Sequence, residues 1–227
     1  MARKAKTKAQ LHLVVTAGPT REHIDPVRYL SNESSGKMGF AIAEEAAKKG
    51  HRVTLIAGPV HQETPAGVDR VDVVSARDML AALKLAFEDA DGLIMAAAVA
   101  DYRPARKRSG KWKKDPSKPG QEVGLALVEN PDLLATVGKR KGDRCVMGFA
   151  LETSDGLRRA FGKMQRKNTD FIALNGAAAL NADSTSVTLI ARDGDQQEWL
   201  GKTKKYVAKR LVMAVEVWIA SKSATRT

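Results

Sequence analysis

The spacing of apolar residues divides the first half of the chain into strands that alternate with helices. Short apolar runs rich in β-branched residues predict four strands, at 12–17, 52–57, 70–74 and 93–95. Apolar residues at helical spacing predict helices over 36–49 and 76–90. This alternation is typical of a parallel sheet covered by helices on both faces. The pattern therefore predicts an α/β, Rossmann-like fold.

The second half continues this sheet and adds an antiparallel edge. Apolar runs predict four more strands, at 144–150, 171–175, 186–191 and 197–200. The last two flank Asp193-Gly194, which is typical of a β-hairpin turn. A closing helix over 204–220 is predicted from an apolar stripe that comprises Val207, Leu211, Ala214, Val215 and Trp218.

Capping residues mark two helices between these strands. The tripeptide Asn130-Pro131-Asp132 is predicted to cap a short helix, and Ser154 or Asp155 to cap the next one. Lys163 and Lys167 on that second helix are four residues apart, so they share one face. A solvated lysine face is the alternative to a binding role.

The connection between the first strand and the first helix is unusually long. It spans 17–35, whereas such loops usually take about 2–6 residues. The helix then begins in Gly36-Lys37-Met38-Gly39, and the N–H groups and dipole of a helix N-terminus favour an anion. The sequence therefore predicts a phosphate site, although a glycine-rich turn that only packs the helix against the sheet is an open alternative.

Composition changes abruptly at 103–120, which contains three prolines, two glycines and eight basic residues. Such a segment is too polar for a core element, so we expect a mobile flap, with a solvated linker as the alternative. The chain has 227 residues, enough for a single α/β domain. We expect a disordered basic arm at 1–10, this domain at 11–222 and a tail at 223–227.

The net charge of +12 is concentrated in three segments. Residues 1–10, 103–118 and 202–226 carry +4, +7 and +6, so the rest of the chain is acidic. Aromatic residues are only 5% of the chain and do not interleave with a basic stripe, which disfavours single-stranded nucleic acid as a partner. A phosphorylated small molecule explains the middle cluster better than nucleic acid does.

Several other classes of protein are disfavoured by what the sequence contains. It has no apolar run of about 18 residues and no apolar N-terminal signal, so we expect a cytoplasmic protein that does not engage a membrane. The single cysteine, Cys145, lies in an apolar run and is expected in the core rather than as a nucleophile. The four histidines show no metal-ligand spacing, and we predict no protein metal site.

Seven blocks of sequence resemble the phosphopantothenoylcysteine synthetase family, in the family's order and over nearly the whole chain. They are TAGPTREHIDPVRYLSNESSGKMGFAIAEEA from Thr16, AAAVADYRP from Ala96, KWKK from Lys111, ENPDLLA from Glu129, GFALET from Gly148, KMQRKN from Lys163 and DFIALN from Asp170. The resemblance implies a ligase that joins 4′-phosphopantothenate and L-cysteine in coenzyme A biosynthesis. An acyl-nucleotide formed from CTP would be the intermediate, with Mg²⁺ carried by the triphosphate.

The resemblance also assigns residues to roles. It implies catalytic roles for Asn32, Arg28 and Lys111, with Asn32 as a donor to the acyl group, Arg28 as its support and Lys111 on the triphosphate. The implied nucleotide contacts are Gly18, Asp101, Lys111, Asn130, Phe149, Lys163 and Lys167. The implied substrate contacts are Gly36, Lys37, Gly39 and Ala98. Phe149 as a core residue and Asp101 as a strand-end cap are the alternatives.

The resemblance implies a homodimer, for which the hairpin after Asn175 is the candidate contact. The family's synthetase is often fused behind a decarboxylase, but Met1 and the basic arm favour a separately encoded protein, for which a decarboxylase is a candidate partner. Among rivals, a nicotinamide-dependent oxidoreductase would need an acidic residue after the second strand, where Ile56-Ala57-Gly58 stands instead. A nucleic-acid-binding module rests only on the pI of 9.9.

Overall fold

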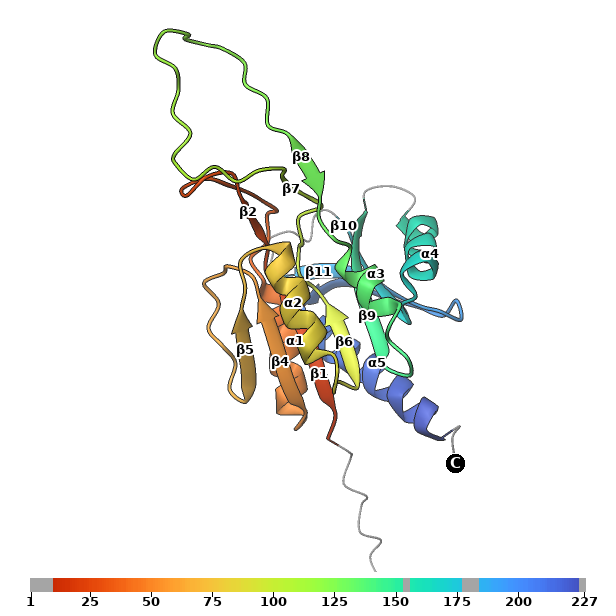
Figure 1. Ribbon diagram of the computed structural model, residues 1–227. Helices are drawn as coiled ribbons and strands as arrows, with labels where there is room; N and C mark the ends of the chain where they lie inside the picture. Colours follow the sequence, from red (N-terminus) through yellow and green to blue (C-terminus); the bar gives the residue numbers. More distant parts are fainter. Residues whose placement is uncertain (1–9, 153–155, 177–183, 225–227) are drawn as a thin grey trace, which may run out of the picture.

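An eight-stranded sheet forms the middle of the protein (Figure 1). The computed structural model describes residues 10–152, 156–176 and 184–224. The strands of the main sheet are β1 (His12–Ala17), β4 (Arg52–Ala57), β5 (Val68–Asp72), β6 (Gly92–Met95), β9 (Cys145–Glu152), β10 (Phe171–Gly176), β11 (Ser184–Ala191) and β12 (Gln196–Thr203). Their order is β12-β11-β10-β9-β6-β1-β4-β5. The strands from β10 to β5 are parallel, and β11 and β12 pair antiparallel at the edge, which confirms the predicted fold.

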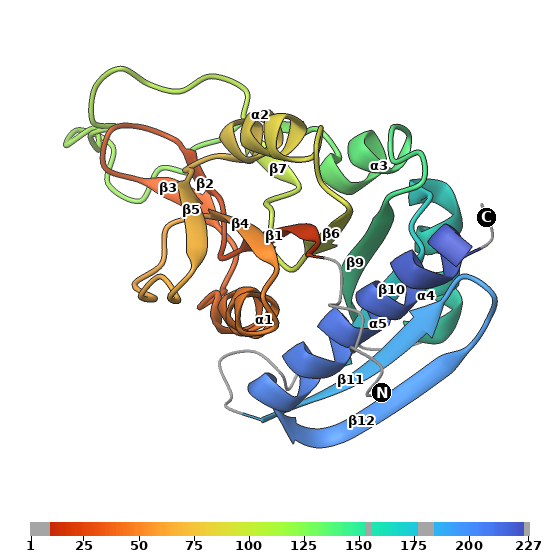
Figure 2. The same ribbon diagram turned by 90° about the horizontal axis from the view of Figure 1, so that it is seen from below.

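Helices cover both faces of this sheet (Figure 2). The helices α1 (Lys37–Lys48) and α5 (Lys204–Ala224) pack on one face, where their buried residues join one apolar cluster. The opposite face carries α2 (Ala76–Ala86), α3 (Leu133–Gly138) and α4 (Gly156–Lys167). The central strands β1, β4 and β6 are therefore buried on both sides, as their continuous apolar sequences require.

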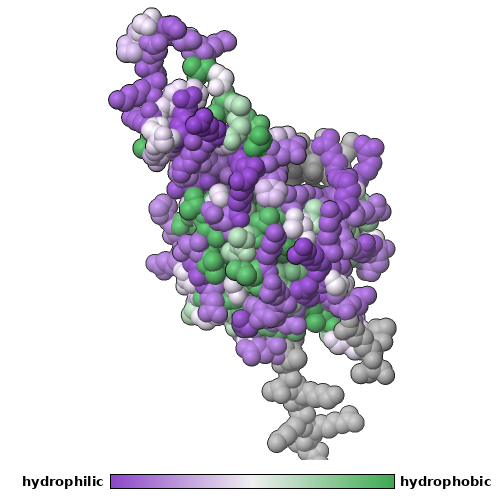
Figure 3. Space-filling view, in the orientation of Figure 1, coloured by the Kyte–Doolittle hydropathy of each residue, from purple (hydrophilic) through white to green (hydrophobic). Residues whose placement is uncertain are grey.

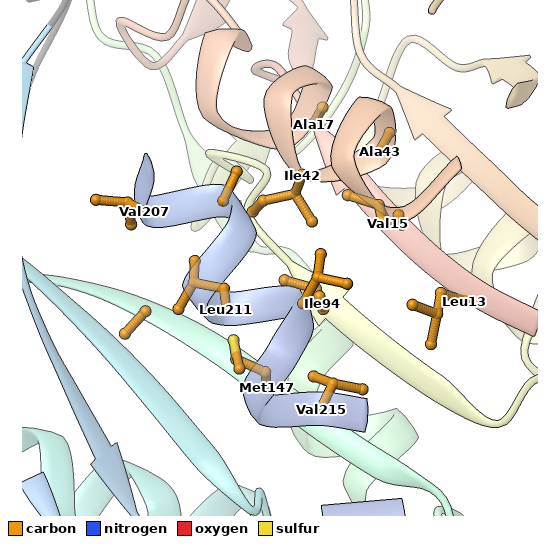
Figure 4. Packing of buried hydrophobic residues seen from close by; sticks show 14 of the residues in the cluster. Leu13, Val15, Ala17, Ile42, Ala43, Ile94, Met147, Val207, Leu211 and Val215 are labelled. Carbon is orange, nitrogen blue, oxygen red and sulfur yellow. The ribbon is translucent and has the colours of Figure 1, made fainter. Parts of the chain in front are cut away.

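The first strand shows how the alternation of side chains builds the two cores. Leu13 and Val15 face α1 and α5, whereas Val14 between them joins the cluster of α2 and α3. Figure 4 shows Ile42 of α1 and Leu211 of α5 meeting over β1 and β6. All five side chains are fully buried. The helix predicted from its apolar stripe is therefore α5, which extends four residues farther than expected.

Two of the predicted boundaries that were wrong have a clear physical reason. The strand placed at 70–74 is β5, which begins two residues earlier because the N–H of Val68 closes a turn onto Pro65 O at 3.3 Å. The helix placed over 76–90 ends at Ala86, because the chain must turn back to enter the sheet beside β1. Asp91 makes that return: its N–H donates to His12 O at 2.9 Å, and its carboxylate accepts the His12 N–H at 2.7 Å.

Two short hairpins lie outside the main sheet, and the sequence analysis missed both. The long loop after β1 contains β2 (Arg21–His23) paired with β3 (Tyr29–Ser31). The basic segment leaves and rejoins the domain through β7 (Tyr102–Pro104) and β8 (Leu127–Glu129), so the projecting loop is 105–126 rather than 103–120. Three-residue strands with polar side chains produce no apolar period. Figure 3 shows that the surface of this flap, residues 105–126, is largely hydrophilic.

Some predictions fall on residues that the structure does not describe. These are nearly all of the arm at 1–10, the caps at Ser154 and Asp155, and the last three residues of the tail. Among the described helices, none has the length and apolar character that crossing a bilayer demands.

The contact between α5 and the sheet provides a test of the fold. Replacing Leu211 by alanine should lower the free energy of unfolding by about 2–5 kcal/mol, because it leaves a cavity beneath a fully buried side chain. The control is Val217→Ala on the same helix, where the side chain is 64% exposed and the expected change is within about 0.5 kcal/mol. Urea denaturation measures both. Equal losses would show that α5 does not pack as described.

Candidate active site

The strand order reverses at β1, which creates a crevice at the carboxyl ends of β1 and β6. The chain segments that follow these two strands are joined by hydrogen bonds. The N–H of Ala98 donates to Gly18 O at 2.9 Å, and the N–H of Ala97 donates to Thr16 Oγ1 at 3.2 Å. Gly18 adopts a φ of 74°, and a Cβ there would lie 2.9 Å from Val60 Cγ1. The absence of a side chain at Gly18 thus lets the loop after β1 pack closely against Val60.

A cavity of about 400 Å³ opens on the α3 and α4 side of this crevice. The loop after β6, the start of α3 and the inner face of α4 form its walls. Its lining includes five of the predicted nucleotide contacts, namely Asp101, Asn130, Phe149, Lys163 and Lys167. Residues separated by up to 66 positions in the chain therefore converge on one space, which we call the α4 cavity.

The two lysines of the α4 cavity are half-buried and already bonded, so the solvated-face alternative does not describe them. Lys163 Nζ donates to Phe149 O at 2.7 Å, and Lys167 Nζ lies 2.8 Å from Asp132 Oδ2. Partial burial alone would raise the pKa of Asp132, but Lys167 and the N–H of Ala135 outweigh it and lower that pKa. The lysines are thus held in place by a carbonyl and a carboxylate, partners that an anionic ligand can replace.

Asn130 holds the wall of the α4 cavity together. Its Nδ2 donates to Ala100 O at 2.9 Å, and its N–H donates to Asp101 O at 2.7 Å. Its Oδ1 accepts from Arg103 Nη1 at 3.3 Å. Because Asn130 uses most of its donors and acceptors on the protein, it presents the main chain around Asp101 to the cavity. Asp101 itself is exposed.

A second cavity, of about 210 Å³, lies at the N-terminus of α1. We call it the α1 cavity. Ala97 and Phe149 line both this cavity and the α4 cavity, so the two cavities are adjacent. All four predicted substrate contacts line the α1 cavity: Gly36, Lys37, Gly39 and Ala98. Phe149 therefore stands between two cavities, whereas the alternative reading placed it in the core.

Two glycines give the N-terminus of α1 its shape. Gly36 is the N-cap with a φ of 74°, and no side chain caps the helix there. A Cβ on Gly39 would lie 2.5 Å from Ala17 Cβ, so only glycine lets the first turn of α1 approach the end of β1 so closely. The helix dipole is thus directed at the α1 cavity.

Among the residues of the α1 cavity that the sequence analysis did not predict are Asn175, Thr185 and Lys204. Asn175 Oδ1 and Thr185 Oγ1 are buried, and neither has a hydrogen-bond partner within the described parts of the chain. Thr185 is only 4% exposed. Buried polar atoms without partners are costly, so they indicate a missing ligand or water. The position of Asn175 at the carboxyl end of β10 was the signal that could have revealed it.

Asn32 lines neither cavity, but it is bonded to the loop that contributes to both. Its Nδ2 donates to Val99 O at 3.1 Å and to Ala98 O at 3.4 Å, in the loop that lines both. Arg28 is positioned differently. Its guanidinium binds the carboxylate of Asp25 and the carbonyl of Trp112 in the flap, and no hydrogen bond of the described chain joins it to Asn32.

The structure places Lys111 outside both cavities, on the flap, where it lines a separate open cavity of about 850 Å³. The α4 cavity contains three carboxylates, from Asp101, Glu129 and Asp132, against two lysines. A polyphosphate would therefore need further positive charge there, and the flap is the nearest strongly basic segment of the sequence.

Two kinds of chemistry find no support at the site. No three histidine, cysteine, aspartate or glutamate side chains converge to hold a metal within residues 10–152, 156–176 and 184–224. Cys145 is fully buried in β9, and burial raises the pKa of its thiol well above the ordinary value. It is therefore a core residue, as expected, and not a nucleophile.

The chain is similar to known proteins in both sequence and fold. The chain is 46% identical over 207 residues to the coenzyme A biosynthesis bifunctional protein CoaBC of Haemophilus influenzae, which covers 89% of this chain and 50% of that protein. The chain thus spans about half the length of such relatives. The crystal structure of a C-terminal domain of CoaBC is 36% identical, with a TM-score of 0.82, and covers 96% of this chain and 100% of that one.

A mutant of Cab2 solved in complex with phosphopantothenate-cysteine shares the fold alone. It is 16% identical, with a TM-score of 0.75, and covers 94% of this chain and 89% of that one. The family model described as "DNA/pantothenate metabolism flavoprotein C-terminal domain" matches residues 8–218. These matches confirm the resemblance seen in the sequence blocks, and the chain belongs to the family of DNA/pantothenate metabolism flavoprotein C-terminal domains.

Proposed function

We propose that the chain is a cytoplasmic ligase that joins 4′-phosphopantothenate to L-cysteine through an acyl-nucleotide formed from CTP, in coenzyme A biosynthesis. The observation that carries the proposal is the pair of cavities that share Ala97 and Phe149 at the carboxyl ends of β1, β6 and β9. A reaction that joins two molecules through a nucleotide needs two neighbouring sites. The names of the relatives support the choice of reaction.

We assign the nucleotide to the α4 cavity. Its wall consists of main chain held rigid by Asn130, which suits recognition of a base by backbone N–H and C=O groups. Lys163 and Lys167 lie on the opposite side, at the end of α4. In this proposal the phosphates replace Phe149 O and Asp132 as partners of the two lysines, and the basic flap supplies the remaining positive charge.

The phosphate of phosphopantothenate belongs in the α1 cavity. The uncapped N-terminus of α1 faces it, and Lys37 and Lys204 add positive charge. The hydroxyl of Thr185, which has no partner within the described chain, would donate to a phosphate oxygen. The carboxylate at the other end of this substrate would then lie near Phe149, beside the α-phosphate of the nucleotide.

The chemistry requires positioning rather than a protein nucleophile. A carboxylate oxygen attacks the α-phosphorus and displaces pyrophosphate, and the amine of cysteine then attacks the acyl carbon and displaces the nucleoside monophosphate. Both steps move negative charge on oxygen, which fixed donors can stabilise. Asn32 is placed to assist the second step, because it lies over the loop that both cavities share.

Mg²⁺ would enter with the triphosphate. The described residues offer no cluster of ligands for it, and Mg²⁺ commonly keeps its waters and uses substrate phosphates. The bound Mg²⁺ would neutralise part of the negative charge of the phosphates. The nicotinamide-dependent alternative is not favoured, because β4 ends in neutral residues and a hairpin occupies the turn after β1.

We propose that two copies of the chain form a dimer through the β11–β12 hairpin. Strand β12 is the free edge of the sheet, and Leu200 on it is 61% exposed. An exposed edge strand offers unpaired backbone groups to a second copy. A decarboxylase, on the same or a separate chain, is the partner that the bifunctional relatives favour.

The role of Asn32 in the second step can be tested directly. Asn32→Ala should release pyrophosphate at close to the normal rate but accumulate the acyl-nucleotide, because cysteine attack loses a donor while activation does not. Rapid quench with labelled CTP and chromatography measures both species. If neither pyrophosphate nor intermediate forms, Asn32 acts in the first step and this assignment is wrong.

The nucleotide assignment predicts that a lysine contributes to CTP binding because of its position in the α4 cavity and not because of the net charge of the chain. Replacing Lys163 and Lys167 together by methionine should weaken CTP binding by roughly 2–3 kcal/mol, since two charge-assisted contacts are lost. Replacing the exposed pair Lys205 and Lys209, also four apart, removes the same charge and should have no comparable effect. Isothermal titration of CTP measures all variants.

A second control concerns the basic arm. Deleting residues 1–10 removes a charge of +4 and should leave CTP affinity nearly unchanged. The melting temperature of the double-lysine variant should also change little, because the ion pair it breaks is only half-buried. Normal CTP affinity in the double variant would contradict the assignment of the nucleotide to the α4 cavity.

A further inference from the structure

A buried carboxylate connects the β2–β3 hairpin to the flap. Asp25, in the turn between β2 and β3, is fully buried. Its Oδ1 accepts the backbone N–H groups of Val27 and Arg28, each at 2.9 Å. Its Oδ2 accepts Arg28 Nε at 2.8 Å and the backbone N–H of Trp112 at 3.0 Å. Only the last of these donors comes from outside the turn, and it is 87 residues away.

Both backbone polar groups of Trp112 are held by this turn. Its N–H donates to Asp25, and its carbonyl accepts from Arg28 Nη2. Arg28 Nη2 also lies 2.7 Å from Asp25 Oδ2, so one guanidinium bridges the carboxylate and the flap. Because Trp112 is attached through both its N–H and its carbonyl, the two contacts fix which residue of the flap docks on the domain and where it docks.

Further contacts hold the same arm of the flap. The N–H of Arg108 donates to Ile24 O at 2.9 Å, and the Arg108 guanidinium lies 4.0 Å from the centre of the Trp112 ring. The N–H of Trp112 is the leading cause that holds the pKa of Asp25 well below its ordinary value of 3.8. The stabilisation from Asp25 is therefore complete above that value and is lost only as the pH falls toward the lowered one.

The hairpin that holds the flap also reaches the active site. Asn32 directly follows β3 and donates to the loop shared by the two cavities, while Asp25 and Arg28 lie at the other end of the same hairpin. Lys111 and Lys113 flank the held peptide of Trp112. The hairpin is thus a rigid connection between the flap lysines and the reacting groups.

We propose that Asp25 is a positioning residue. Together with Arg28 it clamps the backbone N–H and C=O of Trp112, and this clamp sets the region that Lys111 and Lys113 can reach. The effect on catalysis rests on the proposed function, whereas the clamp itself does not. Arg28 thus acts through the flap, which gives a physical basis for a role at a distance from Asn32.

Limited trypsin cleavage after Arg108 measures the clamp in the full chain without substrates. Asp25→Asn and Trp112→Pro should each speed this cleavage about tenfold, because the open flap becomes more populated when the shared hydrogen bond is lost. Trp112→Pro removes the N–H and the indole ring but leaves the buried pair of Asp25 and Arg28 intact. Compared with Trp112→Ala, which removes the ring alone, it decides the matter even if Asp25→Asn fails to fold.

Two matched variants serve as controls. Trp112→Ala keeps the backbone N–H and loses only the stacking of Arg108 on the ring, so its cleavage should speed up much less than that of Trp112→Pro. Asp115→Asn makes the same chemical change as Asp25→Asn, but the Asp115 carboxylate accepts from Ser117 within the flap itself, so protection should remain. Wild-type cleavage rates in Asp25→Asn and Trp112→Pro, or equal rates in the alanine and proline variants at position 112, would overturn the clamp.

The positioning role is read from pyrophosphate release with varied CTP. Trp112→Pro should raise the KM for CTP about tenfold relative to Trp112→Ala, at an unchanged melting temperature. Faster cleavage with an unchanged KM would show that the clamp holds the flap without serving the reaction, and would overturn the positioning role. If the wild-type protein releases no pyrophosphate, the proposed function fails while the cleavage result still judges the clamp.

Discussion

The join between the ends of β1 and β6 is the constraint on which the site depends. At this point the chain has placed β4 and β5 on one side of β1 and must place β6 on the other, so the segments after β1 and β6 diverge. The bonds from Ala98 to Gly18 and from Ala97 to Thr16 stop them separating. They leave a crevice whose floor is main chain and whose walls are α1 on one face and α3 and α4 on the other.

The polar groups around this crevice are divided between those the fold consumes and those it leaves for a ligand. Asn130 uses its side chain to hold the wall, and Lys163 and Lys167 already have internal partners. By contrast, Asn175 and Thr185 present buried oxygens that nothing in the described chain satisfies. In the proposed reaction, the lysines exchange one anionic or carbonyl partner for another, which keeps the cost of the unliganded state low.

The flap illustrates how a strongly basic segment can be held without being folded into the core. Its charge makes it soluble, and one peptide unit at Trp112 docks on a buried carboxylate. Because Asp25 is saturated by donors, it can remain ionised in a position with no solvent contact. The β2–β3 hairpin therefore anchors the flap, although each of its strands has only three residues.

The sequence by itself determined the main sheet and both helix layers. The continuous apolar run of β1 and the stripe that contains Leu211 and Val215 are local signals, because burial on both faces of a strand or on one face of a helix demands them. The family blocks identified nine of the residues that line the two cavities. Only the tertiary structure decided the rest. The β2–β3 hairpin, the end of α2 at Ala86 and the partners of Arg28 depend on contacts between distant segments, which leave no local period. The unpaired oxygens of Asn175 and Thr185 likewise exist only once β10 and β11 close over the α1 cavity, because burial is a property of the packed molecule.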